Sequence, residues 1–112
     1  MRLVSKKTFL SLPENTLYLK LHKSEVLCIK GKSLENHGEY TDWYVQNTCE
    51  IECSGSDEYN DILCKAEDDE NFSFELNLHL EGRDGLFEDE EQFLVYEKKD
   101  VIELIERLKE CL

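Results

Sequence analysis

Cysteine and histidine are the residues of this chain that could form a nucleophile and its general base. The sequence contains three histidines and five cysteines: His22, His37, His79, Cys28, Cys49, Cys53, Cys64 and Cys111. No local motif joins a cysteine to a histidine, and the histidines fall at polar positions or in a polar stretch. We therefore interpret the histidines as solvent-facing and the cysteines as core residues. We predict that the protein is not an enzyme and has no catalytic residues.

The sequence also lacks the residue spacing that is typical of metal and nucleotide sites. Cys49 and Cys53 would lie about 13 Å apart along one strand, too far to bind one zinc ion. The acidic stretches 57–61 and 67–70 offer oxygen ligands, but neither has the ligand series of a calcium-binding loop. No glycine-rich turn leads into a helix, as a phosphate site requires. We therefore predict no metal site and no cofactor.

Charge is the property that distinguishes this sequence. Its 112 residues include 26 acidic and 13 basic residues, a net charge of −13. The charge is uneven, because residues 1–32 carry net +5, residues 33–97 carry net −18 and residues 98–112 are neutral. A field of this sign repels nucleic acid and anionic membranes and attracts basic proteins. We therefore expect a basic protein as the partner and no nucleic-acid or membrane partner, and the oligomeric state stays open.

Alternation of apolar and polar residues predicts an antiparallel sheet. The expected strands and apolar runs are 8–12, 17–21, 25–30, 43–53, 61–66, 72–80 and 93–96, with a loop over 31–41. Apolar residues at three- and four-residue spacing predict a helix over 100–112, with Asp100 as its N-cap. The resulting fold class is α+β. One domain over residues 1–112 is an antiparallel, meander-like sheet of about six or seven strands, with the C-terminal helix packed on it.

Segment 72–80 has the most regular alternation in the chain. Its apolar residues recur at every second position over nine residues, which is typical of a strand. We therefore predict a central strand whose Phe74, Leu76 and Leu78 are buried against the apolar face of the C-terminal helix. That face is formed by Val101, Leu104, Ile105 and Leu108.

An antiparallel pairing of 61–66 with 72–80 would bring two acidic loops, 54–60 and 81–91, to one end of the sheet. Clustering like charges costs stability through self-repulsion, which favours a binding role for such a patch. Tyr59 and Phe87 lie among the acids as potential interface anchors. The predicted partner-binding residues are Asp57, Glu58, Tyr59, Asp61, Glu81, Asp84, Phe87, Glu88, Asp89, Glu90 and Glu91.

These features predict an acidic binding protein that inhibits its partner by covering a basic surface. A bacterial immunity protein that neutralises a nuclease-type toxin has this physical profile, because opposite charge steers association and then covers a site built for phosphates. The same electrostatics fit a nucleic-acid mimic that inhibits a DNA-binding protein. Two alternatives of other classes stay open. One is a dimeric acidic chaperone for a secreted protein, and the other is a small enzyme with a pocket between sheet and helix.

The expected compartment is the cytoplasm. The sequence has no run of about 20 apolar residues and shows no export signal. Five cysteines are an odd number, which would leave a free thiol in an oxidising compartment. We therefore expect all five to be reduced.

Overall fold

A computed structural model describes residues 1–23, 26–36, 39–85 and 89–112. The strands are β1 (Arg2–Ser5), β2 (Leu17–Lys20), β3 (Cys28–Asn36), β4 (Glu39–Asn47), β5 (Gly82–Asp84) and β6 (Gln92–Val95). The helices are α1 (Lys6–Ser11), α2 (Ser56–Asp68) and α3 (Lys98–Lys109).

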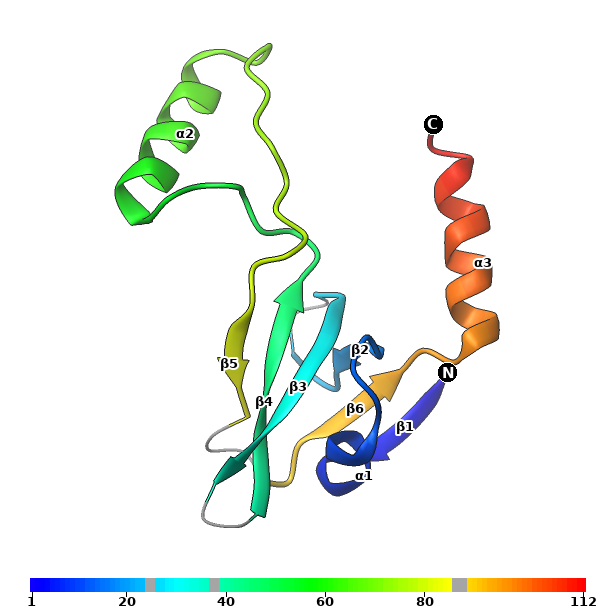
Figure 1. The fold of residues 1–112 in the computed structure, drawn as a ribbon. Coiled ribbons are helices and arrows are strands. Elements are labelled where there is room, and N and C mark those ends of the chain that lie inside the picture. The colour runs from blue at the N-terminus through cyan, green and yellow to red at the C-terminus, as the bar shows by residue number, and fades with distance from the viewer. Residues whose placement is uncertain (24–25, 37–38, 86–88) are drawn as a thin grey trace.

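The six strands form one antiparallel sheet in the order β1-β6-β2-β3-β4-β5. Strands β2 to β5 follow one another as a meander, and β6 returns to lie between β1 and β2. Together with the helices, this arrangement confirms the predicted α+β class and the antiparallel, meander-like sheet with a C-terminal helix (Figure 1).

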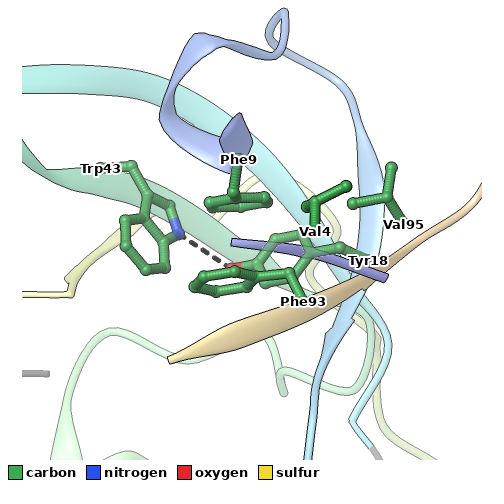
Figure 2. Close-up of a cluster of buried hydrophobic side chains, with 6 residues drawn as sticks. All are labelled: Val4, Phe9, Tyr18, Trp43, Phe93 and Val95. Carbon is green, nitrogen blue, oxygen red and sulfur yellow. Dashed lines mark hydrogen bonds between the residues drawn. The ribbon is translucent and has the colours of Figure 1, made fainter. Parts of the chain in front are cut away.

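Helix α1 closes the core on one face of the sheet. The buried apolar residues are Val4, Phe9, Tyr18, Trp43, Phe93 and Val95 (Figure 2). The Phe9 ring stacks on Phe93 with 4.1 Å between centroids, and it lies 4.6 Å from the ring of Tyr18 and 4.9 Å from that of Trp43. Aromatic side chains bury large areas, so one short helix and four rings are enough to form a small core.

The first apolar run was predicted as strand 8–12, but it belongs to α1. Ser5 caps the helix by accepting a hydrogen bond from the backbone N–H of Thr8, which satisfies a donor that the first turn leaves free. The helix ends before Pro13, which cannot continue it. Asn15 has a φ of 67°, so the predicted turn before β2 uses the left-handed conformation that asparagine tolerates.

The predicted loop 31–41 is also wrong for its described residues, because β3 and β4 extend through most of it. These strands change register between Lys30 and Ser33 and again between Leu34 and Glu35. Gly31 lies at the first irregularity, where a Cβ atom would approach the Cβ of Tyr44 to 2.9 Å. The glycine and the bulges explain why the apolar alternation of a strand is hard to see in this stretch.

Two further expectations about the middle of the chain are contradicted. Segment 61–66 lies within α2, which begins at Ser56 and has Asp57 and Glu58 in its first turn, where acids interact favourably with the helix dipole. Segment 72–80 is not a central strand. It forms a single isolated bridge between Leu76 and Ile51, and Phe74, Leu76, Leu78 and Leu80 are exposed.

The C-terminal helix begins two residues earlier than predicted. Glu97 is the N-cap and Asp100 occupies the third helical position, and each side chain accepts a hydrogen bond from the other's backbone. The Asp100 carboxylate also lies 2.6 Å from the amino group of Met1, which fixes the start of α3 to the start of β1. No residue of α3 is buried, and Phe74, Leu76 and Leu78 are exposed, so the predicted packing of 72–80 against this helix is wrong.

The molecule is extended for its length. Its radius of gyration is 16.4 Å, whereas a compact domain of this size has about 13 Å. Figure 1 shows the reason, because α2 lies beyond the end of β4 while α3 leads away from the edge of the sheet formed by β1 and β6. Apolar residues of both helices therefore stay in contact with solvent.

Candidate partner-binding surface

The structure separates the predicted partner-binding residues into two groups. Asp57, Glu58, Tyr59 and Asp61 are exposed on α2, whereas Asp84 is the last residue of β5 and residues 89–91 lie between β5 and β6, away from α2 (Figure 1). Glu81 is exposed directly before β5, and Phe87 and Glu88 lie outside the described residues. The predicted single acidic end does not form, because the hairpin on which it depended does not exist.

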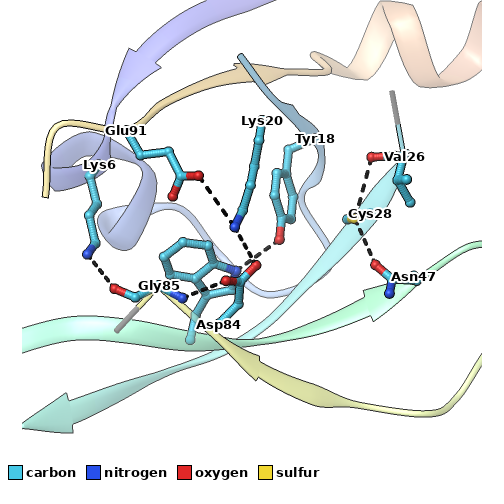
Figure 3. Close-up of polar contacts among 10 residues, drawn as sticks. Lys6, Tyr18, Lys20, Val26, Cys28, Asn47, Asp84, Gly85 and Glu91 are labelled. Atoms are coloured by element: carbon cyan, nitrogen blue, oxygen red, sulfur yellow. Dashed lines mark hydrogen bonds and ion pairs between the residues drawn. The ribbon is translucent and has the colours of Figure 1, made fainter. Parts of the chain in front are cut away.

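Acids of the second group are paired with lysines. Lys20 contacts Asp84 at 2.7 Å and Glu91 at 3.4 Å (Figure 3). Burial opposes the charge of Lys20, but its hydrogen bond to Asp84 and the charges of Asp84 and Glu91 raise its pKa overall. Lys6 lies 3.5 Å from Asp89. Two lysines therefore offset about half of the negative charge of this group, and Asp84 and Glu91 have a structural role.

Negative charge is instead concentrated in residues 48–81, the excursion between β4 and β5 that contains α2 and that we call the acidic arm. The acidic arm carries eleven acids and one lysine, net −10. The rest of the chain carries fifteen acids and twelve basic residues, net −3. One third of the chain therefore holds most of its net charge.

Apolar side chains are exposed on the same arm. They are Tyr59, Phe74, Leu76, Leu78 and Leu80, with exposed fractions between 41% and 56%. No residue of α2 is buried, although Ile62, Leu63 and Ala66 recur at helical spacing and are half-buried. The apolar residues of a helix normally pack against a core, so the acidic arm presents an apolar surface that the described residues leave uncovered.

Backbone hydrogen bonds hold the base of the acidic arm. The N–H of Glu52 donates to the carbonyl of Glu75 at 2.9 Å, and that of Asn77 donates to the carbonyl of Glu50 at 2.8 Å. Gln46 on β4 donates from its side chain to the Asn77 carbonyl at 3.1 Å. The two sides of the arm are thus joined near the sheet, which positions α2 as a projecting element.

Glu58 stabilises the start of α2. Its carboxylate accepts hydrogen bonds from the hydroxyl and the backbone N–H of Ser54. The hydroxyl bond, followed by the backbone bond, lowers the pKa of Glu58, so this carboxylate stays ionised under mildly acidic conditions. Glu58 therefore has a local structural partner, unlike a freely mobile surface acid.

Sequence reasoning found the acidity but not the surface that carries it. The signal that could have located this surface is the charge of residues 48–81 taken alone. The cysteines also differ from the prediction, because Cys49, Cys64 and Cys111 are exposed rather than in the core. All five cysteines are free thiols in the structure.

Among the described residues, no three or more metal-ligating side chains are grouped to hold an ion. The helices in this part of the chain are also too short or too polar to span a bilayer. Comparison with known proteins finds no matching family, no similar curated protein and no similar solved structure. The chemistry of the surface is therefore the basis for a functional interpretation.

Proposed function

We propose that this protein is a non-catalytic binding protein whose acidic arm covers a basic, partly apolar surface on another protein. The observation that carries the proposal is the coincidence on residues 48–81 of net charge −10 with five exposed large apolar side chains. Charge on such a surface accelerates and orients association, and the desolvation of apolar side chains supplies most of the affinity.

Solubility alone is a weaker explanation for the acidic arm. Acids that only keep a protein soluble can be dispersed over the whole surface, and they do not require exposed phenylalanine and leucine beside them. Concentrating acids in one element costs stability through repulsion. Exposing apolar groups there adds an aggregation risk that a binding partner would remove.

The partner we propose is a nucleic-acid-processing protein, most simply a bacterial nuclease-type toxin. A surface built to bind phosphates is rich in lysine and arginine, and a projecting acidic element can occupy it in place of the nucleic acid. The protein would then act as an immunity protein. We propose the cytoplasm as its compartment, since five free thiols, three of them exposed, suit a reducing environment.

A second candidate, the dimeric chaperone, is favoured by α3. This helix exposes Ile102, Ile105 and Leu108, and residues 98–112 have no net charge. A second copy could pack on α3 without the repulsion that two acidic arms would experience. The acidic arm would then bind the secreted client. A monomeric mass in solution would argue against this candidate.

Affinity capture from the source cell tests the proposal. The arm variant would carry Asp61→Asn, Glu67→Gln, Asp68→Asn and Glu70→Gln, four exposed positions on the acidic arm. A matched control would neutralise four exposed acids elsewhere: Glu90, Glu103, Glu106 and Glu110. We expect a basic protein to be captured by the parent and the control but much less by the arm variant.

A second step is needed, because capture alone does not establish inhibition. The purified partner should degrade or bind nucleic acid, and stoichiometric addition of this protein should suppress that activity. A partner without nucleic-acid activity would contradict the immunity role. Equal capture by both variants would contradict a role for the acidic arm.

A further inference from the structure

A cavity of about 760 Å³ lies between α1 and strands β3 and β4, apart from the acidic arm. Its volume is within the range of sites for small ligands. The walls combine apolar residues, Leu10 and Leu12, with polar residues from both strands. Among the described residues, three lysines and two acids line it, a net positive lining in a protein of net charge −13.

Lys30 on β3 is one of the residues that line this cavity. Its side chain is 2% exposed, and its Nζ donates to the carbonyl of Leu12 at 3.0 Å and to the hydroxyl of Ser33 at 2.9 Å. The ring of Phe9 lies 5.7 Å from the ammonium. No carboxylate of the described residues lies within ion-pair distance of Lys30. Burial lowers its pKa, because the charged form loses hydration that these neutral partners replace only in part.

Lys6 provides an internal comparison. It is also buried and lines the same cavity, but its Nζ donates to the Gly85 carbonyl at 2.6 Å (Figure 3). The same Nζ lies 3.5 Å from the carboxylate of Asp89. Lys6 therefore has a counter-ion within the fold. Lys30 has no carboxylate at ion-pair distance among the described residues, and the charge of Glu14, which lines the same cavity, offsets its loss of hydration only in part. The positive charge of Lys30 is therefore incompletely compensated beside a cavity that is large enough for a ligand.

Thr41 supplies an independent observation. It lines the same cavity from β4, and its hydroxyl oxygen is buried with no hydrogen-bond partner in the described part of the chain. Buried hydroxyl groups are normally hydrogen-bonded, so an unpaired one beside a cavity indicates a missing partner. A hydroxyl can donate to an anion, as can the remaining N–H of Lys30.

We infer that this cavity binds a small organic anion, a carboxylate with a short apolar chain. The carboxylate would take hydrogen bonds from Lys30 and Thr41, and the apolar chain would lie against Leu10 and Leu12. Glu14, which also lines the cavity, would weaken binding through repulsion and favour ligands with a single negative charge.

Hexanoate and hexylamine are suitable probes, because they share an apolar chain and carry opposite charges. Titration of the full-length protein followed by NMR should show hexanoate shifting the signals of Lys30 and Thr41, and hexylamine leaving them unchanged. Equal effects of the two probes would overturn the inference, since the site would then recognise only the apolar chain. Shifts confined to other residues would overturn it as well.

Two substitutions separate recognition from folding. Thr41→Val keeps the shape of the side chain and removes a hydroxyl for which the described residues provide no hydrogen-bond partner, so the melting temperature should not fall. Lys30→Met keeps the length but removes both the charge and the hydrogen bonds to Leu12 and Ser33, so its melting temperature should fall modestly while the protein still folds, and Thr41→Val gives the loss of recognition without a loss of stability. We expect hexanoate affinity to fall about tenfold or more in each variant, the usual size of a lost charge-assisted hydrogen bond. Unchanged affinity in both would overturn the inference.

Discussion

The indole nitrogen of Trp43 on β4 donates a hydrogen bond to the phenol oxygen of Tyr18 on β2, 2.9 Å away, and both side chains are fully buried. The bond crosses the intervening strand β3 and links the two sides of the aromatic core (Figure 2). Burial raises the pKa of Tyr18 far above its ordinary value, so the folded state favours the neutral phenol that accepts this bond. The core therefore contains a polar contact that fixes the relative positions of its two largest side chains.

Replacing Tyr18 with phenylalanine tests this contact. The substitution keeps the ring but leaves the buried Trp43 N–H without an acceptor, which typically costs about 1–3 kcal/mol. We expect the free energy of unfolding to fall by this amount in chemical denaturation. An unchanged value would show that water reaches the indole nitrogen.

Phe9 and Phe74 distinguish the observed core from the one predicted from sequence. Phe9 is fully buried among three other rings, whereas Phe74 is 45% exposed. Phe9→Ala should destabilise the protein by about 3–5 kcal/mol, because it leaves a cavity in the core. Phe74→Ala should change stability by less than about 0.5 kcal/mol. The denaturation midpoints of the two variants measure this difference. Equal losses of stability would show that segment 72–80 belongs to the core.

The parts of the fold that could be predicted are those in which local pattern and tertiary packing agree. Strands at 17–20 and 92–95 and the C-terminal helix have regular periodicity, and each appears close to its expected position. Segment 72–80 has the same regularity but only one bridge to another segment. Alternation shows that two faces differ in polarity, but it does not supply a pairing partner, and a strand requires both.

The candidate site was predictable in its charge but not in its position. Segment 61–66 has apolar residues at 62, 63 and 66, a spacing that fits a helix, and two acids at 57 and 58 mark its start. Reading this segment as a strand created a hairpin with 72–80. In that predicted hairpin, the acids of α2 would lie next to residues 89–91. The wrong assignment of one segment therefore put the whole predicted surface in the wrong place.

Gly85 is a position where any side chain should be damaging. Its φ is 88°, a conformation that residues with a Cβ rarely adopt, and a Cβ there would overlap the ring of Trp43. We expect Gly85→Ala to cost about 2–4 kcal/mol from strain and overpacking together. Gly82→Ala, at the start of β5 three residues earlier, is the matched control, because nothing lies within 4 Å of its Cβ position. Equal denaturation midpoints for the two variants would contradict this account.

Cys28 should be the least reactive thiol at neutral pH. Burial, and next the nearby charge of Asp84, raise the pKa of its thiol to about 11, and its Sγ lies 3.1 Å from the side-chain oxygen of Asn47. Alkylation of the folded protein, followed by mass spectrometry, should modify the exposed Cys49, Cys64 and Cys111 first. The rate at Cys28 should reach half of its maximum near pH 11. A half-maximum near the ordinary thiol pKa would show that this residue is solvated.

The same raised pKa affects stability with a definite sign. An unfolded Cys28 loses its proton near pH 9, whereas the folded protein keeps it until about pH 11. The folded state therefore binds more protons in this interval, and its stability decreases as the pH rises from 9 to 11. Lys30 and Tyr18 also titrate under alkaline conditions, so the comparison must be made with Cys28→Ala. That variant should lose less stability over the interval, as measured by denaturation at each pH.

The last prediction concerns how the acidic arm acts on its partner. Reversing charge at Asp61, Glu67, Asp68 and Glu70 with lysine should lower the association rate with the captured partner, because these exposed acids would steer the encounter. The effect should decrease with added salt, which screens exposed charges beyond about 10 Å at 0.1 M. Phe74→Ala and Leu78→Ala should instead raise the dissociation rate, since exposed apolar residues act only after contact. Stopped-flow mixing at several salt concentrations measures both rates.

The decisive control reverses the same number of charges outside the acidic arm, at Glu90, Glu103, Glu106 and Glu110. The two sets change the net charge of the protein equally, so any difference between them reports on position. A larger loss of association rate in the arm set would support binding through residues 48–81. Equal losses of association rate would mean that the electrostatic field of the whole protein attracts the partner. The acidic arm would then have no special role. If neither set alters the association rate or the affinity, the acidity serves only solubility and the proposed function is wrong.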